Sequence, residues 1–151
     1  MTAPRTILTA GLLAGTLDIT AACTQSWLMR GVMPSRVFQS VASGALGPDA
    51  FTGGWQTAAL GLLFHFFIAT TAATVFYLAS RKIGMLTKQW IPSGVLYGIA
   101  VYTTMYWIVV PLSKARPFNP VPQLILIAVL IHIFCVGLPI AWVVRKSGGN
   151  V

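Results

Sequence analysis

Four long runs of apolar residues constrain the fold of this chain more than any other feature. The runs cover approximately residues 7–28, 55–80, 90–112 and 122–144. A helix of about 20 apolar residues crosses the hydrocarbon core of a bilayer, and helices and closed barrels are the structures that satisfy their backbone in lipid. We therefore predict an all-α membrane protein, a bundle of four transmembrane helices that forms a single domain over residues 1–151.

Composition and charge support this prediction and argue against a nucleic-acid partner. Of the 151 residues, 56% are hydrophobic and 8% are charged, whereas soluble domains carry about 25% charged residues. The net charge is +8, but the basic residues lie at the ends of the apolar runs, where such residues anchor helices and set topology. Because they form no basic stripe with interleaved aromatic residues, we expect the lipid bilayer as partner and no nucleic acid.

The distribution of basic residues also predicts an orientation. Four spans place both termini on one side of the membrane. Because cytoplasmic loops carry an excess of Lys and Arg, we expect that side to be the cytoplasm. The termini side holds Arg5, Arg81, Lys82, Lys88, Arg145 and Lys146, and the other side holds Arg30, Arg36, Lys114 and Arg116.

The connection between the first two spans contains a shorter helical pattern. Pro34 suits the first turn of a helix, and Gly44 or Gly47 suits its end. We predict a short amphipathic helix that lies at the membrane interface, with an ordered loop as the alternative. Its apolar face would carry Val37, Phe38, Val41 and Ala45.

Three polar residues fall at the same depth in the predicted spans. At 1.5 Å per residue, Asp18 lies about 16 Å into the first span, and His65 and His132 lie about 15 Å into the second and fourth. An ionised carboxylate is costly in hydrocarbon and needs a partner. We predict that Asp18 pairs with His65, because a carboxylate beside an imidazole stabilises the imidazolium.

Other partners for Asp18 remain open. A protonated carboxyl could donate a hydrogen bond to Thr20, Gln25 or Tyr102. Pro139 in the fourth span denies a backbone donor to the carbonyl of Cys135, which predicts either a plain kink or a break that lines a cavity.

Small residues mark the faces on which the helices should pack. Gly11 and Gly15 form a G-x-x-x-G pattern on the face that carries Asp18, and Gly61 lies on the face that carries His65. Such residues let membrane helices approach closely. Gly94 and Gly98 repeat the pattern in the third span, and if that face is exposed we expect it to pack on another protein.

The sequence supports three hypotheses on function. The first is a structural or accessory subunit that packs against a larger membrane complex or against copies of itself. The second is a small transporter or proton-handling channel that uses Asp18 and His65. The third is binding of haem or another tetrapyrrole through His65 and His132, because a small residue precedes each by four positions and clears space for a macrocycle.

No motif indicates an enzyme. We also expect no metal site, although His132 and Cys135 share a helical face that would suit a soft metal. The sequence lacks a P-loop, an H-E-x-x-H and a G-x-S-x-G motif, and no loop is long enough for a catalytic domain. Polar side chains inside membrane bundles also act as interhelical hydrogen bonds without further function.

Four groups of residues give the chain a resemblance to known proteins. They are Gly11, Gly15 and Asp18; residues 63–67 with the sequence LFHFF; residues 109–113 with VVPLS; and His132 with residues 137–139, GLP. Together they resemble the small, uncharacterised four-helix inner-membrane proteins of bacteria. That resemblance implies a four-helix fold and a place in the bacterial inner membrane, and it implies no activity.

Overall fold

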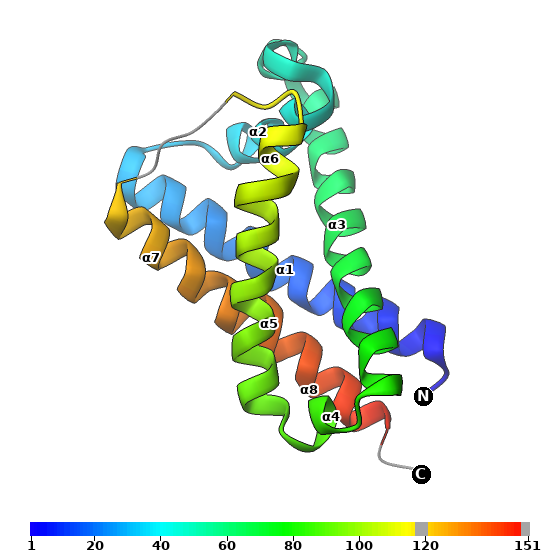
Figure 1. Cartoon of the computed structure of the whole chain (residues 1–151). Helices are drawn as coiled ribbons and strands as arrows, with labels where there is room; N and C mark the ends of the chain where they lie inside the picture. Colours follow the sequence, from blue (N-terminus) through cyan, green and yellow to red (C-terminus); the bar gives the residue numbers. More distant parts are fainter. Residues whose placement is uncertain (117–120, 149–151) are drawn as a thin grey trace.

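The computed structural model describes residues 1–116 and 121–148 and is all-helical in this part of the chain (Figure 1). The helices are α1 (Ala3–Arg30), α2 (Pro34–Leu46), the 3-10 helix η1 (Gly47–Phe51), α3 (Gly54–Lys82), α4 (Met85–Lys88), α5 (Trp90–Thr104), the π-helix η2 (Met105–Val109), α6 (Val110–Leu112), α7 (Pro122–Ile131), the π-helix η3 (His132–Gly137) and α8 (Leu138–Ser147). The predicted all-α fold is therefore confirmed.

Four continuous stretches are long and apolar enough to cross a membrane, as predicted. They are Ala3–Arg30, Gly54–Lys82, Trp90–Leu112 and Pro122–Ser147. Two of them begin before the predicted limits, at Ala3 and Gly54, and two begin at the predicted residues. Proline fits the first turn of a helix, where no intrahelical amide is needed. Pro4 and Pro122 occupy this position in α1 and α7.

The four stretches form two layers that cross each other. α3 and α5 lie in front, and α1 and the α7–η3–α8 stretch cross behind them, with the marked termini at the same end (Figure 1). α1 packs on α3 and on η3 and α8, and α5 packs on η3 and α8. α3 and α5 make little backbone contact with each other, although they follow one another in the chain.

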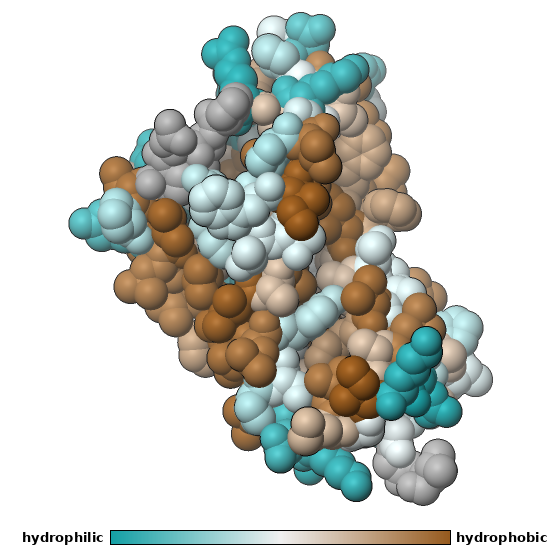
Figure 2. All heavy atoms as spheres, in the orientation of Figure 1, coloured by the Kyte–Doolittle hydropathy of each residue, from teal (hydrophilic) through white to brown (hydrophobic). Residues whose placement is uncertain are grey.

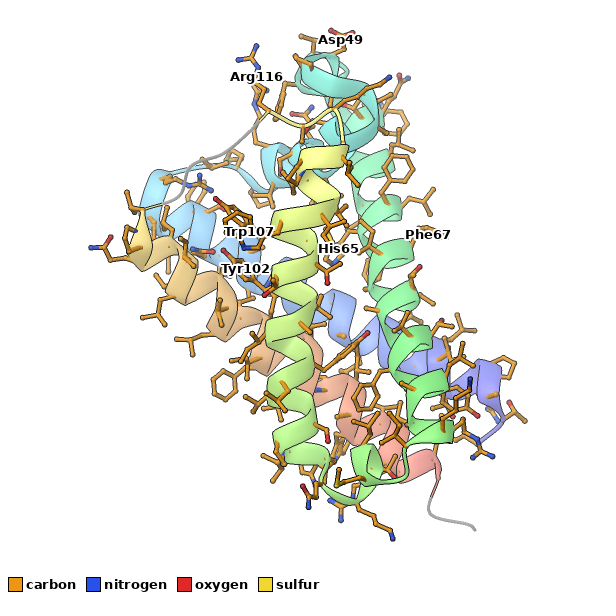
Figure 3. The ribbon with its side chains drawn as sticks, in the orientation of Figure 1. Asp49, His65, Phe67, Tyr102, Trp107 and Arg116 are labelled. Atoms are coloured by element: carbon orange, nitrogen blue, oxygen red, sulfur yellow. The ribbon has the colours of Figure 1, made fainter. Side chains whose placement is uncertain are left out.

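The surface is apolar over much of its area. Figure 2 shows hydrophobic side chains over the middle of the molecule and hydrophilic ones gathered at helix ends. Asp49 and Arg116 lie at the end opposite the termini (Figure 3). Large apolar side chains point outward from all four stretches, including Leu12 (53% exposed), Phe67 (70%), Leu96 (68%) and Phe134 (63%).

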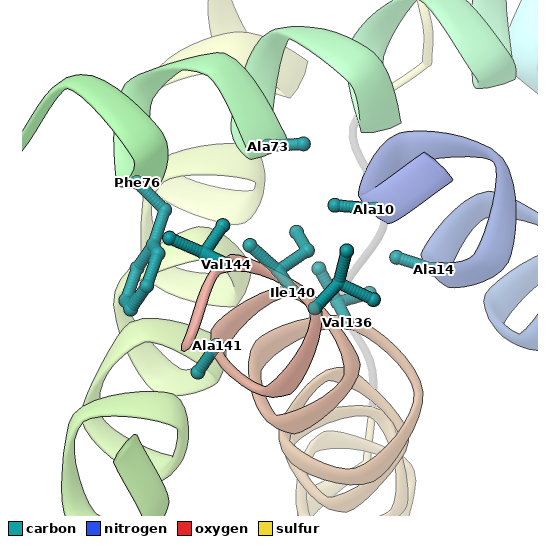
Figure 4. Close-up of a cluster of buried hydrophobic side chains, with 9 residues drawn as sticks. Ala10, Ala14, Ala73, Phe76, Val136, Ile140, Ala141 and Val144 are labelled. Atoms are coloured by element: carbon teal, nitrogen blue, oxygen red, sulfur yellow. The ribbon is translucent and has the colours of Figure 1, made fainter. Parts of the chain in front are cut away.

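The buried core is small and lies toward the termini, where α1, α3 and the fourth stretch cross (Figure 4). Phe76 of α3 and Ile140 of α8 are its largest fully buried apolar side chains. Alanines complete it and let the helices come close. The cluster consists of Ala10, Ala14, Ala73, Phe76, Val136, Ile140, Ala141, Val143 and Val144.

The G-x-x-x-G pattern of α1 brings its backbone against α3. A Cβ atom at Gly11 would lie 2.7 Å from the Cα of Thr70, and one at Gly15 would lie 2.8 Å from the Phe66 ring. Real Cβ atoms do not come this close to other heavy atoms. At Gly11 the obstacle is backbone, so α1 and α3 can pack in this way only with glycine there, whereas at Gly15 a side chain would require the Phe66 ring to move.

The G-x-x-x-G pattern of α5 is buried inside the chain, so the condition under which we expected it to pack on another protein, an exposed face, is not met. Gly94 and Gly98 are buried and face the fourth stretch. A Cβ at Gly98 would lie 2.6 Å from the Cα of Ile133. Gly137 contributes from the other side, because a Cβ there would collide with the carbonyl oxygen of Gly94. Three glycines thus form one interhelical contact within the chain.

The short helix predicted between the first two stretches is present as α2, but it uses a different face. It starts at Pro34, and Gly47 follows it with φ 68°. Its buried side chains include Gln39 and Ser43, which lie outside the expected apolar face. The Gln39 amide donates to the carbonyl of Gly54 at 2.9 Å, so the polar side of α2 is bonded to the start of α3.

Both π-helices end just before a proline. The amide of Val110 donates to the carbonyl of Met105, and that of Leu138 to Ile133, each across five residues. Pro111 and Pro139 come next, and proline has no amide proton and collides with the carbonyl four residues before it. A π-turn relieves that collision by shifting the register. The break predicted at Pro139 is therefore a π-helical segment, η3. The third stretch contains an equivalent π-helix, η2, before Pro111.

Candidate functional site

The middle of α1 carries the one buried side-chain oxygen or nitrogen without a partner in the described part of the chain. Asp18 is half-buried, and its Oδ1 atom is fully buried and accepts no hydrogen bond from any described residue. A buried acceptor without a donor costs about 1–3 kcal/mol, and more if it is charged. This makes Asp18 the first candidate for a functional group.

His65 does not form the predicted pair with Asp18. Its Nε2 lies 2.8 Å from the carbonyl oxygen of Gly15. A carbonyl only accepts, so Nε2 carries the proton and donates it. The reason lies in the glycine face of α1, where no side chain covers the carbonyl. The imidazole of α3 therefore reaches the backbone one turn before Asp18, and it connects α3 to α1 (Figure 3).

His132 lies in a different environment, beside α5. Its Nδ1 donates to the carbonyl of Ala128 at 2.8 Å, and its ring meets that of Tyr102 edge to face at 5.5 Å. Tyr102 in turn stacks on Tyr106 at 5.9 Å. Of the predicted site residues, His132 and Tyr102 are brought into ring contact.

The tetrapyrrole hypothesis gains no support from this geometry. His65 bonds to α1, whereas His132 bonds within its own helix and packs on α5. The grooves described below contain neither imidazole. Residues 1–116 and 121–148 also hold no group of three His, Cys, Asp or Glu side chains that could bind a metal.

The helix that carries Asp18 packs on the π segment η3, which contains Cys135. Pro139 leaves this segment one backbone donor short. The Thr20 hydroxyl donates to the carbonyl of Thr16 at 2.7 Å. The structure shows no hydrogen bond from Thr20, Gln25 or Tyr102 to the buried Asp18 oxygen, so none of these predicted alternatives is realised there.

Two interhelical polar contacts were not identified from the sequence. The Tyr97 hydroxyl donates to the carbonyl of Ala72 at 2.6 Å and connects α5 to α3. Gln39 connects α2 to the start of α3. In the sequence, Gln39 lies one helical turn after Arg36 and is followed by small residues. This pattern does not indicate which backbone carbonyl the Gln39 amide would bind.

A furrow runs between α3 and α5. Three adjoining hollows of about 480, 330 and 360 Å³ follow the two helices. The first and second share Phe67, Ile68, Met105 and Val109, and the second and third share Tyr97 and Ala100. The furrow therefore extends from Ser113 at one end of the third stretch to Gln89 at the other.

Comparison with known proteins finds no matching family model, no matching curated protein and no matching solved structure. The assignment of function therefore depends on the geometry of this chain.

The separation of His65 from Asp18 predicts additive effects of mutation. His65→Phe removes an interhelical hydrogen bond and should lower the free energy of unfolding by about 0.6–1.7 kcal/mol. Asp18→Asn removes no hydrogen bond, so it should cause no loss. In a double-mutant cycle followed by thermal unfolding in detergent, the two effects should add within about 0.5 kcal/mol. Recovery of stability in the double mutant would show that the two side chains interact after all.

Proposed function

We propose that this protein is inserted in the bacterial inner membrane with both termini in the cytoplasm. The proposal is supported by four helices of sufficient length and apolarity, of which at most 28% of the most apolar stretch is buried inside the chain. The exposed apolar side chains would be stable in contact with lipid and costly in contact with water. The excess of basic residues at the termini end supports the orientation.

Within the membrane, we propose a structural or accessory role, without a catalytic step, in which the protein assembles with another membrane-spanning helix. The observation that carries this proposal is the exposure of the third stretch. Only 6% of the most apolar part of Trp90–Leu112 is buried, against 22–28% for the other three. Its inner face binds the fourth stretch through Gly94 and Gly98, and its other side borders the furrow.

The length of the furrow favours a helix as its occupant. From Gln89 to Ser113, the third stretch would extend about 36 Å at 1.5 Å per residue. One leaflet provides about half of the roughly 30 Å hydrocarbon core, so a single acyl chain would fill only part of the furrow. A transmembrane helix, from a larger complex or from a second copy of this chain, would fill all of it.

Site-specific photocrosslinking in bacterial membranes tests this role. A photoreactive residue at Ala100, which lines two of the three hollows, should give a discrete protein adduct in the inner-membrane fraction. The same residue at Ile99, which is 38% exposed and does not line them, is the matched control and should give none. The mass of the adduct distinguishes a second copy from another subunit. Absence of a protein adduct at position 100, or equal adducts at both positions, would contradict the proposal.

Proton or cation handling at Asp18 is the second candidate. It is favoured by the buried Oδ1 atom that no described residue satisfies, because ionisable groups inside membranes often mark ion routes. A proton or small cation would satisfy that atom. His65 would take no direct part in this role, because its Nε2–H group is already hydrogen-bonded to the carbonyl of Gly15.

Reconstitution in liposomes tests this second candidate. Wild-type protein should increase the proton or sodium flux driven by an imposed gradient, and Asp18→Asn should abolish the increase. Cys23→Ser, another change in a half-buried polar side chain of α1, serves as the control and should leave the flux unchanged. A flux that Asp18→Asn does not alter would exclude the candidate.

A further inference from the structure

A polar pocket lies at the termini end of the molecule. It has a volume of about 460 Å³ and is formed by the ends of α3 and α8 and by α4. Its polar lining consists of Tyr77, Ser80, Arg81, Thr87 and Ser147. Pockets of about 300–1,000 Å³ are the usual size for small-ligand sites, so this pocket can hold a head group or a small anion.

Most hydroxyl groups of this pocket already donate a hydrogen bond to a backbone carbonyl. Ser80 donates to the carbonyl of Tyr77 at 2.7 Å, Thr87 to Gly84 at 3.0 Å and Ser147 to Val144 at 2.8 Å. Among the residues that the structure describes, Arg81 and the Tyr77 hydroxyl make no such bond. Among the side chains that line the pocket, the free donors are therefore the Arg81 guanidinium and the Tyr77 phenol, which suit an acceptor with several oxygen atoms.

Among the residues that the structure describes, the side-chain charge at this end of the molecule is positive, and no acidic side chain lies there. The chain contains only two acidic residues. Asp18 lies in the middle of α1, and Asp49 lies at the opposite end (Figure 3). Two of the neighbouring cations lie over aromatic rings, with Arg145 5.6 Å from the Trp90 centroid and Lys146 4.1 Å from that of Trp142. In residues 1–116 and 121–148, Arg81 has neither an aromatic nor an acidic partner.

From this arrangement we infer that the pocket binds a phosphate group, carried by an anionic phospholipid. Arginine presents a planar fork that matches two phosphate oxygens, and basic pockets at the cytoplasmic ends of transmembrane helices bind anionic head groups. The lipid as source rests on the membrane insertion proposed above, whereas the phosphate chemistry rests only on the pocket. Tyr77 would donate to a third oxygen of the group.

Thermal unfolding of the purified full chain in a neutral detergent tests this inference. The probes are short-chain phosphatidylglycerol, phosphatidylcholine with the same chains, and inorganic phosphate. Phosphatidylglycerol should raise the melting temperature in a saturable way, and phosphatidylcholine should raise it much less. Arg81→Gln should weaken the apparent affinity by roughly tenfold or more, because hydrogen bonds to a charged group are lost.

Lys82→Gln is the matched control, because it removes the same charge from the next residue, which does not line the pocket. It should change the affinity less than twofold. If Arg81→Gln does not fold, Tyr77→Phe replaces it and must weaken binding of phosphatidylglycerol. Stabilisation by inorganic phosphate alone that is lost in Arg81→Gln would support the phosphate site and make soluble phosphate its source. Equal effects of the two lipids without an effect of phosphate, or equal losses in Arg81→Gln and Lys82→Gln, would overturn the inference.

Discussion

At Gly98 and Gly137 the backbones of α5 and the fourth stretch lie so close that neither position has space for a Cβ atom. The same holds for α1 against α3 at Gly11 and for α2 against α3 at Gly61. Lipid is as apolar as leucine, so helices in a membrane associate through close packing and hydrogen bonds. Glycine supplies both, because it allows backbones to approach and leaves their carbonyls uncovered. The small buried core could not hold four long helices together without these contacts.

This mode of packing explains where the polar side chains bond. His65, Tyr97 and Gln39 all donate to backbone carbonyls of a neighbouring helix, and Gln39 also donates to the Thr57 hydroxyl at 3.3 Å. Each carbonyl belongs to Gly15, Ala72 or Gly54, where little side-chain volume blocks access. It also explains the furrow, because the glycines of α5 bind it to the fourth stretch. α3 and α5 are then joined mainly by Tyr97, and the space between them stays open to a further helix. Asp18 differs from these three residues, because no described residue donates a hydrogen bond to its buried Oδ1 atom.

Much of the architecture could be predicted from the sequence, and the pairing of the polar groups could not. Apolar runs located all four long helices, and Pro34 with Gly47 located α2. Depth and helical face placed Asp18 and His65 near one another. Periodicity, however, does not tell which atom accepts the hydrogen bond of the imidazole. The imidazole of His65 donates its hydrogen bond to the carbonyl of Gly15, which no side chain of that residue covers. The face of Gly94 and Gly98 was likewise identified as a packing face, but a pattern of small residues does not say whether the partner lies inside or outside the chain.

The central claim is that glycine-mediated backbone contact holds the protomer together, and a matched pair of Gly→Ala substitutions tests it most directly. Gly98→Ala places a methyl group against the backbone of Ile133, whereas Gly84→Ala meets nothing within 4 Å. Overpacking of a close contact costs about 1–3 kcal/mol, so Gly98→Ala should lower the free energy of unfolding by this amount in detergent or lipid. Gly84→Ala should change it by no more than about 0.5 kcal/mol. Equal stability of the two variants would contradict the account.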